Sequence, residues 1–290
     1  MSKKWDGKSK AGVLGYQIFI VAIKTFGLYL PYFLLYFTAA YYYLFVPKAK
    51  KPILWFYKNV LKYPHLKAHL MTYKNFVSFG KTLIDRIIFQ LGQGEKFTFE
   101  CENKHYLVEM RDNGKGGILL SAHVGNWETA GNMLKDQITS KINVVMLDAE
   151  VEAIKEYMQK STGGSRFNII PIKDDLSHVI KIKMALDNNE FVAIHADRIV
   201  PDSKTIECNL LGQTIKLPAG PFIIASKFNA PVTFVYSNKE SNTHYHLSAT
   251  KPIYDKMTPE AIAGMYVAEL ERKVKLYPDQ WFNYFDYFAQ

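Results

Sequence analysis

Short apolar runs alternate with helix-like stretches along the chain after residue 92. The runs that are typical of strands lie at residues 97–102, 107–110, 118–122, 143–147, 168–172, 191–195, 232–236 and 244–249. Helical stretches are predicted at residues 126–134, 150–160, 174–187 and 220–228. A last long helix is expected to begin at Thr258 and Pro259. Strands that alternate with helices predict an α/β fold, with a largely parallel mixed sheet flanked by helices.

The amino-terminal part is apolar in a different way, because residues 25–46 carry no charged side chain and are rich in Leu, Phe and Tyr. About 20 apolar residues are enough to cross the hydrocarbon core of a bilayer. We therefore expect an N-terminal membrane helix, with residues 1–50 as a membrane anchor and residues 51–290 as the globular domain. Lysines on both sides leave its orientation open, and Lys24 and Pro31 leave open a re-entrant or interfacial helix. A wholly buried core helix is the other alternative.

Residues 51–92 are predicted to be a basic helical region that leads into the globular domain. Aromatic residues such as Trp55 and Tyr57 are mixed with lysines there. This mixture favours an amphipathic helix at a membrane surface, and a soluble helix with a solvated lysine face is the alternative. Breaks are expected near Pro64 and at Gly80.

The net charge of +9 is typical both of nucleic-acid-binding proteins and of proteins on anionic membranes. Nucleic acid is the less favoured partner, because the positive charge lies beside the apolar segment and no nucleic-acid-binding motif is present. The two cysteines, Cys101 and Cys208, form no Cys-x-x-Cys motif and no Cys/His cluster. The sequence therefore supports neither a disulfide framework nor a zinc site, and we expect a reducing, cytoplasmic setting for the globular part.

His123 and Glu128 stand five residues apart, directly after the apolar run that ends at residue 122. That run fits a central strand, so His123 is expected at its carboxyl end, where open α/β sheets bind their ligands. A neutral imidazole at such a place can take a proton from a hydroxyl. Glu128 would accept the other ring N–H and stabilise the imidazolium. A helix-capping pair without chemistry is the alternative.

The pattern His-x-x-Asn-Trp-Glu, formed by His123, Asn126, Trp127 and Glu128, resembles the signature of the bacterial lipid A biosynthesis (late) acyltransferases. A second block, which begins at His195-Ala196-Asp197-Arg198 and runs to Ala230-Pro231-Val232, resembles the downstream block of that family. Residues 277–282 are similar to its closing motif. The resemblance lies within the wider lysophospholipid acyltransferase superfamily and covers nearly the whole chain. It implies a glycerol-3-phosphate acyltransferase-like fold and an O-acyltransferase that needs no cofactor and no metal.

The resemblance also implies further site residues. Asp197 corresponds to a site aspartate of the family and is followed by Arg198; a surface ion pair of these two residues is the alternative. Arg166 is the candidate for a functional arginine, because its planar guanidinium could grip a phosphate or a carbonyl. Asn126 and Trp127 are expected to shape the turn and its packing, and His195 is expected to be a packed strand end.

The implied reaction moves a fatty acyl group from acyl carrier protein or acyl-coenzyme A to a lipid hydroxyl, with His123 as the general base. The acceptor would be a lipid A precursor, or another bacterial lipid such as a lyso-aminolipid or a lysophospholipid. No acyl-enzyme is expected, and backbone N–H groups of the Val124-Gly125-Asn126 turn and the following helix start would bind the oxyanion. The implied location is the bacterial inner membrane, with the catalytic domain on the cytoplasmic side. A non-catalytic, membrane-associated lipid-binding protein is the alternative from another class.

Overall fold

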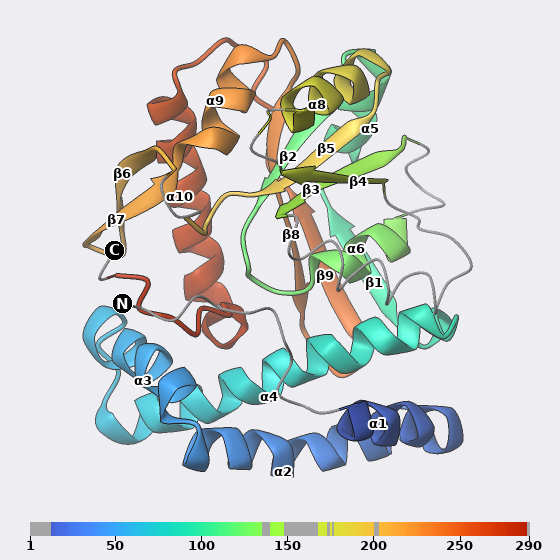
Figure 1. The fold of residues 1–290 in the computed structure, drawn as a ribbon, viewed down its shortest axis with the longest axis vertical. Helices are drawn as coiled ribbons and strands as arrows, with labels where there is room; N and C mark the ends of the chain where they lie inside the picture. Colours follow the sequence, from blue (N-terminus) through green and yellow to red (C-terminus); the bar gives the residue numbers. More distant parts are fainter. Residues whose placement is uncertain are drawn as a thin grey trace.

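A seven-stranded mixed sheet forms the centre of the protein (Figure 1). The structure is a computed structural model, and it describes residues 13–134, 140–147, 168–172, 175, 177–199 and 203–288. The strands of this sheet are β1 (Thr98–Glu102), β2 (Gly117–Ser121), β3 (Ile142–Leu147), β4 (Asn168–Ile172), β5 (Phe191–His195), β8 (Val232–Lys239) and β9 (His244–Ala249). Their order is β1-β9-β8-β2-β5-β3-β4. The five strands from β8 to β4 are parallel, whereas β9 pairs antiparallel with β8, so the predicted α/β class with a largely parallel sheet is confirmed.

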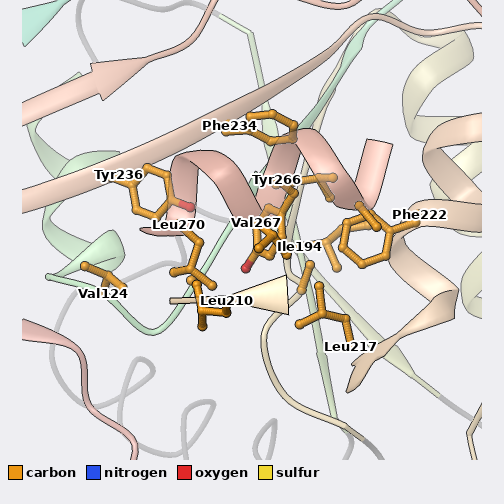
Figure 2. Packing of buried hydrophobic residues seen from close by; sticks show 14 of the residues in the cluster. Val124, Ile194, Leu210, Leu217, Phe222, Phe234, Tyr236, Tyr266, Val267 and Leu270 are labelled. Atoms are coloured by element: carbon orange, nitrogen blue, oxygen red, sulfur yellow. The ribbon is translucent and has the colours of Figure 1, made fainter. Parts of the chain in front are cut away.

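Successive residues of a strand point to opposite faces of the sheet. Both faces carry apolar side chains, and helices cover both of them. Ile118 and Leu120 of β2 pack in one core with α8 (Ser177–Asp187), α9 (Ala219–Lys227) and α10 (Pro259–Leu276). Figure 2 shows part of this core, where Tyr266 and Leu270 of α10 lie among residues of β5 to β8. Leu119 faces the other core, which is built with α4 (His65–Gln90), α5 (Lys104–Asp112) and α6 (Trp127–Leu134).

The uncharged segment 25–46 does not form one helix. It is divided between α1 (Val13–Phe26) and α2 (Tyr29–Phe45), because Gly27 adopts a left-handed conformation with φ of 68° and ends the first helix. Tyr32, Leu35 and Ala39 of α2 are buried, and α2 packs along α4 beneath the sheet in the view of Figure 1. None of the helices in the described part of the chain combines the length and the apolar character that a membrane crossing requires. The expected single membrane helix is therefore not supported.

The basic helical region consists of α3 (Pro47–Trp55), a π-helical turn η1 (Phe56–Val60) and the long helix α4. The predicted break near Pro64 is confirmed, since Pro64 precedes the first residue of α4. The predicted break at Gly80 is wrong, because α4 continues through it. A Cβ atom at position 80 would lie 2.1 Å from Leu35 Cδ1, so this glycine allows α2 to approach α4 closely.

One prediction of secondary structure after residue 92 fails, and one pair of strands was not predicted. Residues 107–110 belong to α5 and not to a strand; Leu107 and Met110 lie three residues apart and are both buried, which is a helical spacing. The antiparallel hairpin of β6 (Thr205–Leu210) and β7 (Gln213–Pro218) was not predicted, although its apolar residues alternate. The predicted helix at 150–160 lies outside the described residues.

Candidate active site

The site is built where two neighbouring parallel strands end. β2 and β5 lie side by side, and Ser121 is in register with His195. His123 and Asp197 each follow two residues later, so the strand pairing brings together two side chains that are 74 residues apart in sequence. The expectation that His123 stands at the carboxyl end of a strand is confirmed by this position.

His123 and Asp197 form a doubly hydrogen-bonded pair. Nδ1 of His123 lies 2.7 Å from one carboxylate oxygen of Asp197, and the backbone N–H of His123 donates to the other at 3.0 Å. Burial alone would raise the pKa of Asp197, but the facing His123 and its hydrogen bond hold that pKa below its usual range. The Asp197 carboxylate is therefore ionised at neutral pH and fixes the orientation of the His123 ring.

The carboxylate at the ring of His123 is thus not the one that the spacing predicted. Glu128 accepts a hydrogen bond from Nη1 of Arg86 at 2.9 Å, and both side chains are partly exposed. Glu128 lies in the first turn of α6 and Arg86 lies on α4, so their ion pair joins the two helices beside the site. Arg86 was not identified from the sequence, because nothing in its helical surroundings distinguishes it from other surface arginines.

The turn after β2 is fixed by backbone hydrogen bonds from distant segments. The N–H of Gly125 donates to Gln280 at 2.9 Å, and that of Asn126 donates to the carbonyl of Ser237 at 2.7 Å. Gly125 has φ of 77°, and a Cβ atom there would lie 2.0 Å from the Ser237 carbonyl oxygen. Phe282 N–H donates to the carbonyl of His123 at 3.0 Å. The carboxyl-terminal motif 277–282 therefore holds the turn that carries His123.

This arrangement corrects the prediction about the oxyanion for two of the N–H groups of the turn. The N–H groups of Gly125 and Asn126 already donate to protein carbonyls, so they cannot also bind a developing negative charge. The side-chain amide of Asn126 donates to the carbonyl of Thr82 and to the hydroxyl of Tyr245, each at 3.3 Å, which fits its expected role in shaping the turn. An oxyanion at this site therefore needs donors other than these two, and the N–H groups at the start of α6, which were also predicted, stay candidates.

His195 was expected to be a packed strand end, but it lies beside His123. The two ring centroids are 4.6 Å apart, and Trp127 makes an edge contact with the His195 ring at 5.4 Å. Nδ1 of His195 is 2.8 Å from Oγ of Ser121. Burial, and then the nearby His123, lower the pKa of His195 to about 3, so its imidazole is neutral at physiological pH.

The remaining predicted residues lie farther from this centre. Arg198 donates from Nη2 to the carbonyl of Phe282 at 2.8 Å, and its guanidinium lies 5.7 Å from the ring centre of Phe285. It thereby holds the carboxyl-terminal segment next to the His123 turn. Arg166 lies outside the described residues.

An apolar pocket lies between the sheet and helices α5 and α6, with Ser121, Trp127, His195 and Ser237 at the carboxyl end of the strands. Most of its wall is hydrocarbon, from Leu107, Leu119, Ala130, Ile142, Val144, Phe191, Val235 and Leu247. Along β5 the wall extends from His195 back to Phe191. This lining suits an apolar group that enters from the polar end of the strands.

Ring nitrogens of His123 and His195 and an oxygen of Asp197 lie within 4.8 Å of one another, a spacing that could surround a cation. Both Asp197 oxygens, however, already accept hydrogen bonds from His123. A histidine ring that faces a buried, ionised carboxylate in this way has the geometry that a general base and its orienting acid require.

The comparison with known protein families agrees with this chemistry. The family described as bacterial lipid A biosynthesis acyltransferase matches residues 67–286, which include His123, Asp197 and the carboxyl-terminal motif. No curated protein matches the chain. The match covers most of the sequence, and the chain belongs to the bacterial lipid A biosynthesis acyltransferase family.

Proposed function

We propose that this lipid acyltransferase moves a fatty acyl group from a thioester to a hydroxyl of a lipid acceptor, with His123 as the general base. The observation that carries the proposal is the His123–Asp197 pair, whose His123 ring lies 4.6 Å from the ring of His195 at the polar end of the apolar pocket. A protein that only holds a lipid would need the pocket, but it would not need an ionised aspartate behind a histidine ring. The pair therefore favours catalysis over lipid storage.

The reaction can be written with the residues of the site. His123 takes the proton of the acceptor hydroxyl while the hydroxyl oxygen attacks the thioester carbonyl, and Asp197 stabilises the imidazolium that forms. The tetrahedral intermediate then expels the thiolate, which receives the proton from His123. The new ester bond replaces the thioester bond, no residue is acylated, and the enzyme returns to its starting state.

The family supports an acyl donor and a lipid acceptor, and our proposal names both more closely. The donor is acyl carrier protein or acyl-coenzyme A, and the acceptor is a lipid A precursor; a lyso-aminolipid or a lysophospholipid is the second candidate. The wall from His195 to Phe191 supports an acyl chain in the pocket.

We propose that the protein acts at the cytoplasmic side of the bacterial inner membrane, with α2 lying in the interface. Phe33, Phe37 and Tyr41 recur every four residues on α2 and are each more than half exposed. Exposed lysines, Lys48 and Lys51, follow this face and would meet anionic headgroups. This mode needs no membrane-crossing helix, and it brings a lipid acceptor to the side of the molecule where α4 contacts the site.

The test is transfer of a radiolabelled acyl group by purified protein to a bacterial lipid extract, with the product identified by mass spectrometry. His123→Ala and Asp197→Asn should each lower the rate by about 10²–10⁴-fold, the usual contribution of a positioned base. His105→Ala and Asp112→Asn, at exposed positions of α5, are the matched controls and should keep full activity. Unchanged transfer by folded His123→Ala would remove the mechanism, and the lipid class that gains label names the acceptor.

A further inference from the structure

His195 has no part in the reaction as written above, although it lines the pocket at its polar end. Its ring is in contact range of both His123 and Trp127, and it belongs to the same sheet face as the apolar wall. The thioester carbonyl is attacked by the hydroxyl that His123 deprotonates. This carbonyl must therefore lie close to the His195 ring. The N–H groups of Gly125 and Asn126 are already used, so a side chain at this end of the pocket can add a donor for the oxyanion beside the N–H groups at the start of α6.

The protonation of His195 limits what it can do. Burial, followed by the nearby His123, lowers its pKa to about 3, so it cannot act as a second base at neutral pH. A neutral imidazole still offers one N–H donor and one acceptor nitrogen. His195 can therefore take part in catalysis by donating a hydrogen bond without giving up its proton.

Two tautomers of neutral His195 fit its contact with Ser121, and the one that leaves Nε2 protonated is the one in which the Ser121 hydroxyl donates to Nδ1. The Ser121 carbonyl already accepts from the N–H of Ala196 and from the hydroxyl of Tyr266, each at 2.9 Å. The Ser121 hydroxyl lies 2.8 Å from Nδ1 of His195 and can donate to it. With Nδ1 as the acceptor, the ring proton is on Nε2, the nitrogen that Ser121 does not occupy.

We propose that His195 is a catalytic residue of this acyltransferase whose Nε2–H donates a hydrogen bond to the thioester carbonyl oxygen as it becomes an oxyanion. The inference rests on the proposed acyl transfer. His123 moves the proton from the acceptor hydroxyl to the leaving thiol, the C–O bond forms and the C–S bond breaks. His195 keeps its own proton throughout, and Ser121 holds its ring as a positioning residue.

Three substitutions at position 195 distinguish the effect of losing the N–H donor from the effect of losing the aromatic ring. His195→Phe keeps an aromatic ring against Trp127 but has no N–H. His195→Gln carries an amide N–H near the position of Nε2, whereas the shorter His195→Asn carries its amide near Nδ1. The assay is release of thiol from dodecanoyl-coenzyme A and from the matching acyl carrier protein thioester, with bacterial lipid extract as acceptor.

His195→Phe should lower kcat by about 10²–10³-fold with little change in KM, the usual effect of losing one oxyanion donor. His195→Gln should be at least tenfold faster than His195→Phe, and His195→Asn should stay slow. Thermal unfolding of each variant identifies any loss that comes from misfolding, and His105→Phe on the exposed face of α5 is the matched control. Should His195→Phe fail to fold, the comparison of Gln with Asn decides the question.

Equal rates for folded His195→Gln and His195→Asn, or an unchanged kcat in His195→Phe, would overturn the role of His195. Failure of the proposed function has a different signature. In that case the wild-type protein releases no thiol, or His123→Ala is as active as the wild type. An inactive His123→Ala beside a fully active His195→Phe would refute only the inference about His195.

Discussion

At the scale of single residues, Asp197 and Glu128 have different partners in the structure, although the sequence pattern does not distinguish these two carboxylates. Asp197 is fully buried and bonds to the His123 ring, whereas Glu128 is partly exposed and bonds to Arg86. The buried carboxylate can stabilise a charge on His123 at short range and without competing water. The exposed one lies on the first turn of α6 and connects this turn to α4.

The lowered pKa of His195 predicts how stability responds to acid. The folded protein keeps this ring neutral, while the unfolded chain takes up a proton below the ordinary pKa of 6.5. The stabilisation is complete above pH 6.5 and is lost as the pH falls toward about 3, at about 1.4 kcal/mol per pH unit. His123 and Arg198 oppose protonation of the ring and Asp197 favours it, but burial is the larger effect.

Between pH 7 and pH 5, the wild-type protein should therefore lose about 2 kcal/mol more unfolding free energy than His195→Phe. Urea unfolding of both proteins at the two pH values measures the difference. Asp197 does not interfere in this range, because its pKa is depressed and its stabilisation is lost only at lower pH. Equal acid sensitivity of the two proteins would contradict the buried, neutral state of His195.

At the scale of secondary-structure elements, one buried ion pair joins four of them. Asp85 of α4 accepts from Nζ of Lys239 of β8 and from the hydroxyls of Tyr32 of α2 and Tyr245 of β9. Burial raises the pKa of Asp85 and lowers that of Lys239, so both shifts reflect the cost of removing these charges from water. Tyr245 in turn accepts from Asn126, which connects the ion pair to the turn that carries His123.

Removing one charge of this pair should be more harmful than removing both. Asp85→Asn leaves Lys239 buried and unpaired, and it should lower the unfolding free energy by about 3–5 kcal/mol. The double variant Asp85→Asn/Lys239→Met should recover most of this loss, because no charge remains to be desolvated. Urea denaturation of the single and double variants gives the coupling directly, and strictly additive losses would show that the two charges do not stabilise each other.

At the scale of the whole molecule, exposed aromatic residues lie on the outer side of the helical layer formed by α1, α2 and α4. The exposed fractions of Phe33 and Phe37 are 58% and 63%, values that are unfavourable in water for such large apolar side chains. α8 lies at the opposite end of the molecule in Figure 1 and offers a matched pair, Ile180 and Met184, with exposed fractions of 65% and 59%.

Phe33→Asp/Phe37→Asp should weaken binding to vesicles of anionic phospholipid at least tenfold, because burying each Phe contributes about 1.5–3 kcal/mol. Ile180→Asp/Met184→Asp adds the same charge on α8 and should leave vesicle binding nearly unchanged. Co-sedimentation with the vesicles measures both variants, and thermal unfolding confirms that they are folded. Equal weakening by the two pairs would mean that net charge, and not the α2 face, determines binding.

The sequence by itself determined the strands that carry the site, the position of His123 after a buried strand, and the family. These features depend on residues within a few positions of one another, so apolar runs and short motifs report them. Tertiary structure alone decided that Asp197, and not the nearer Glu128, faces the His123 ring, because this depends on β5 pairing with β2. It also decided that Ser237 and Gln280 occupy two of the N–H groups expected to bind an oxyanion, and that His195 lines the site. These contacts join residues 74 to 155 positions apart or follow from strand order, which the periodicity of one sequence does not encode.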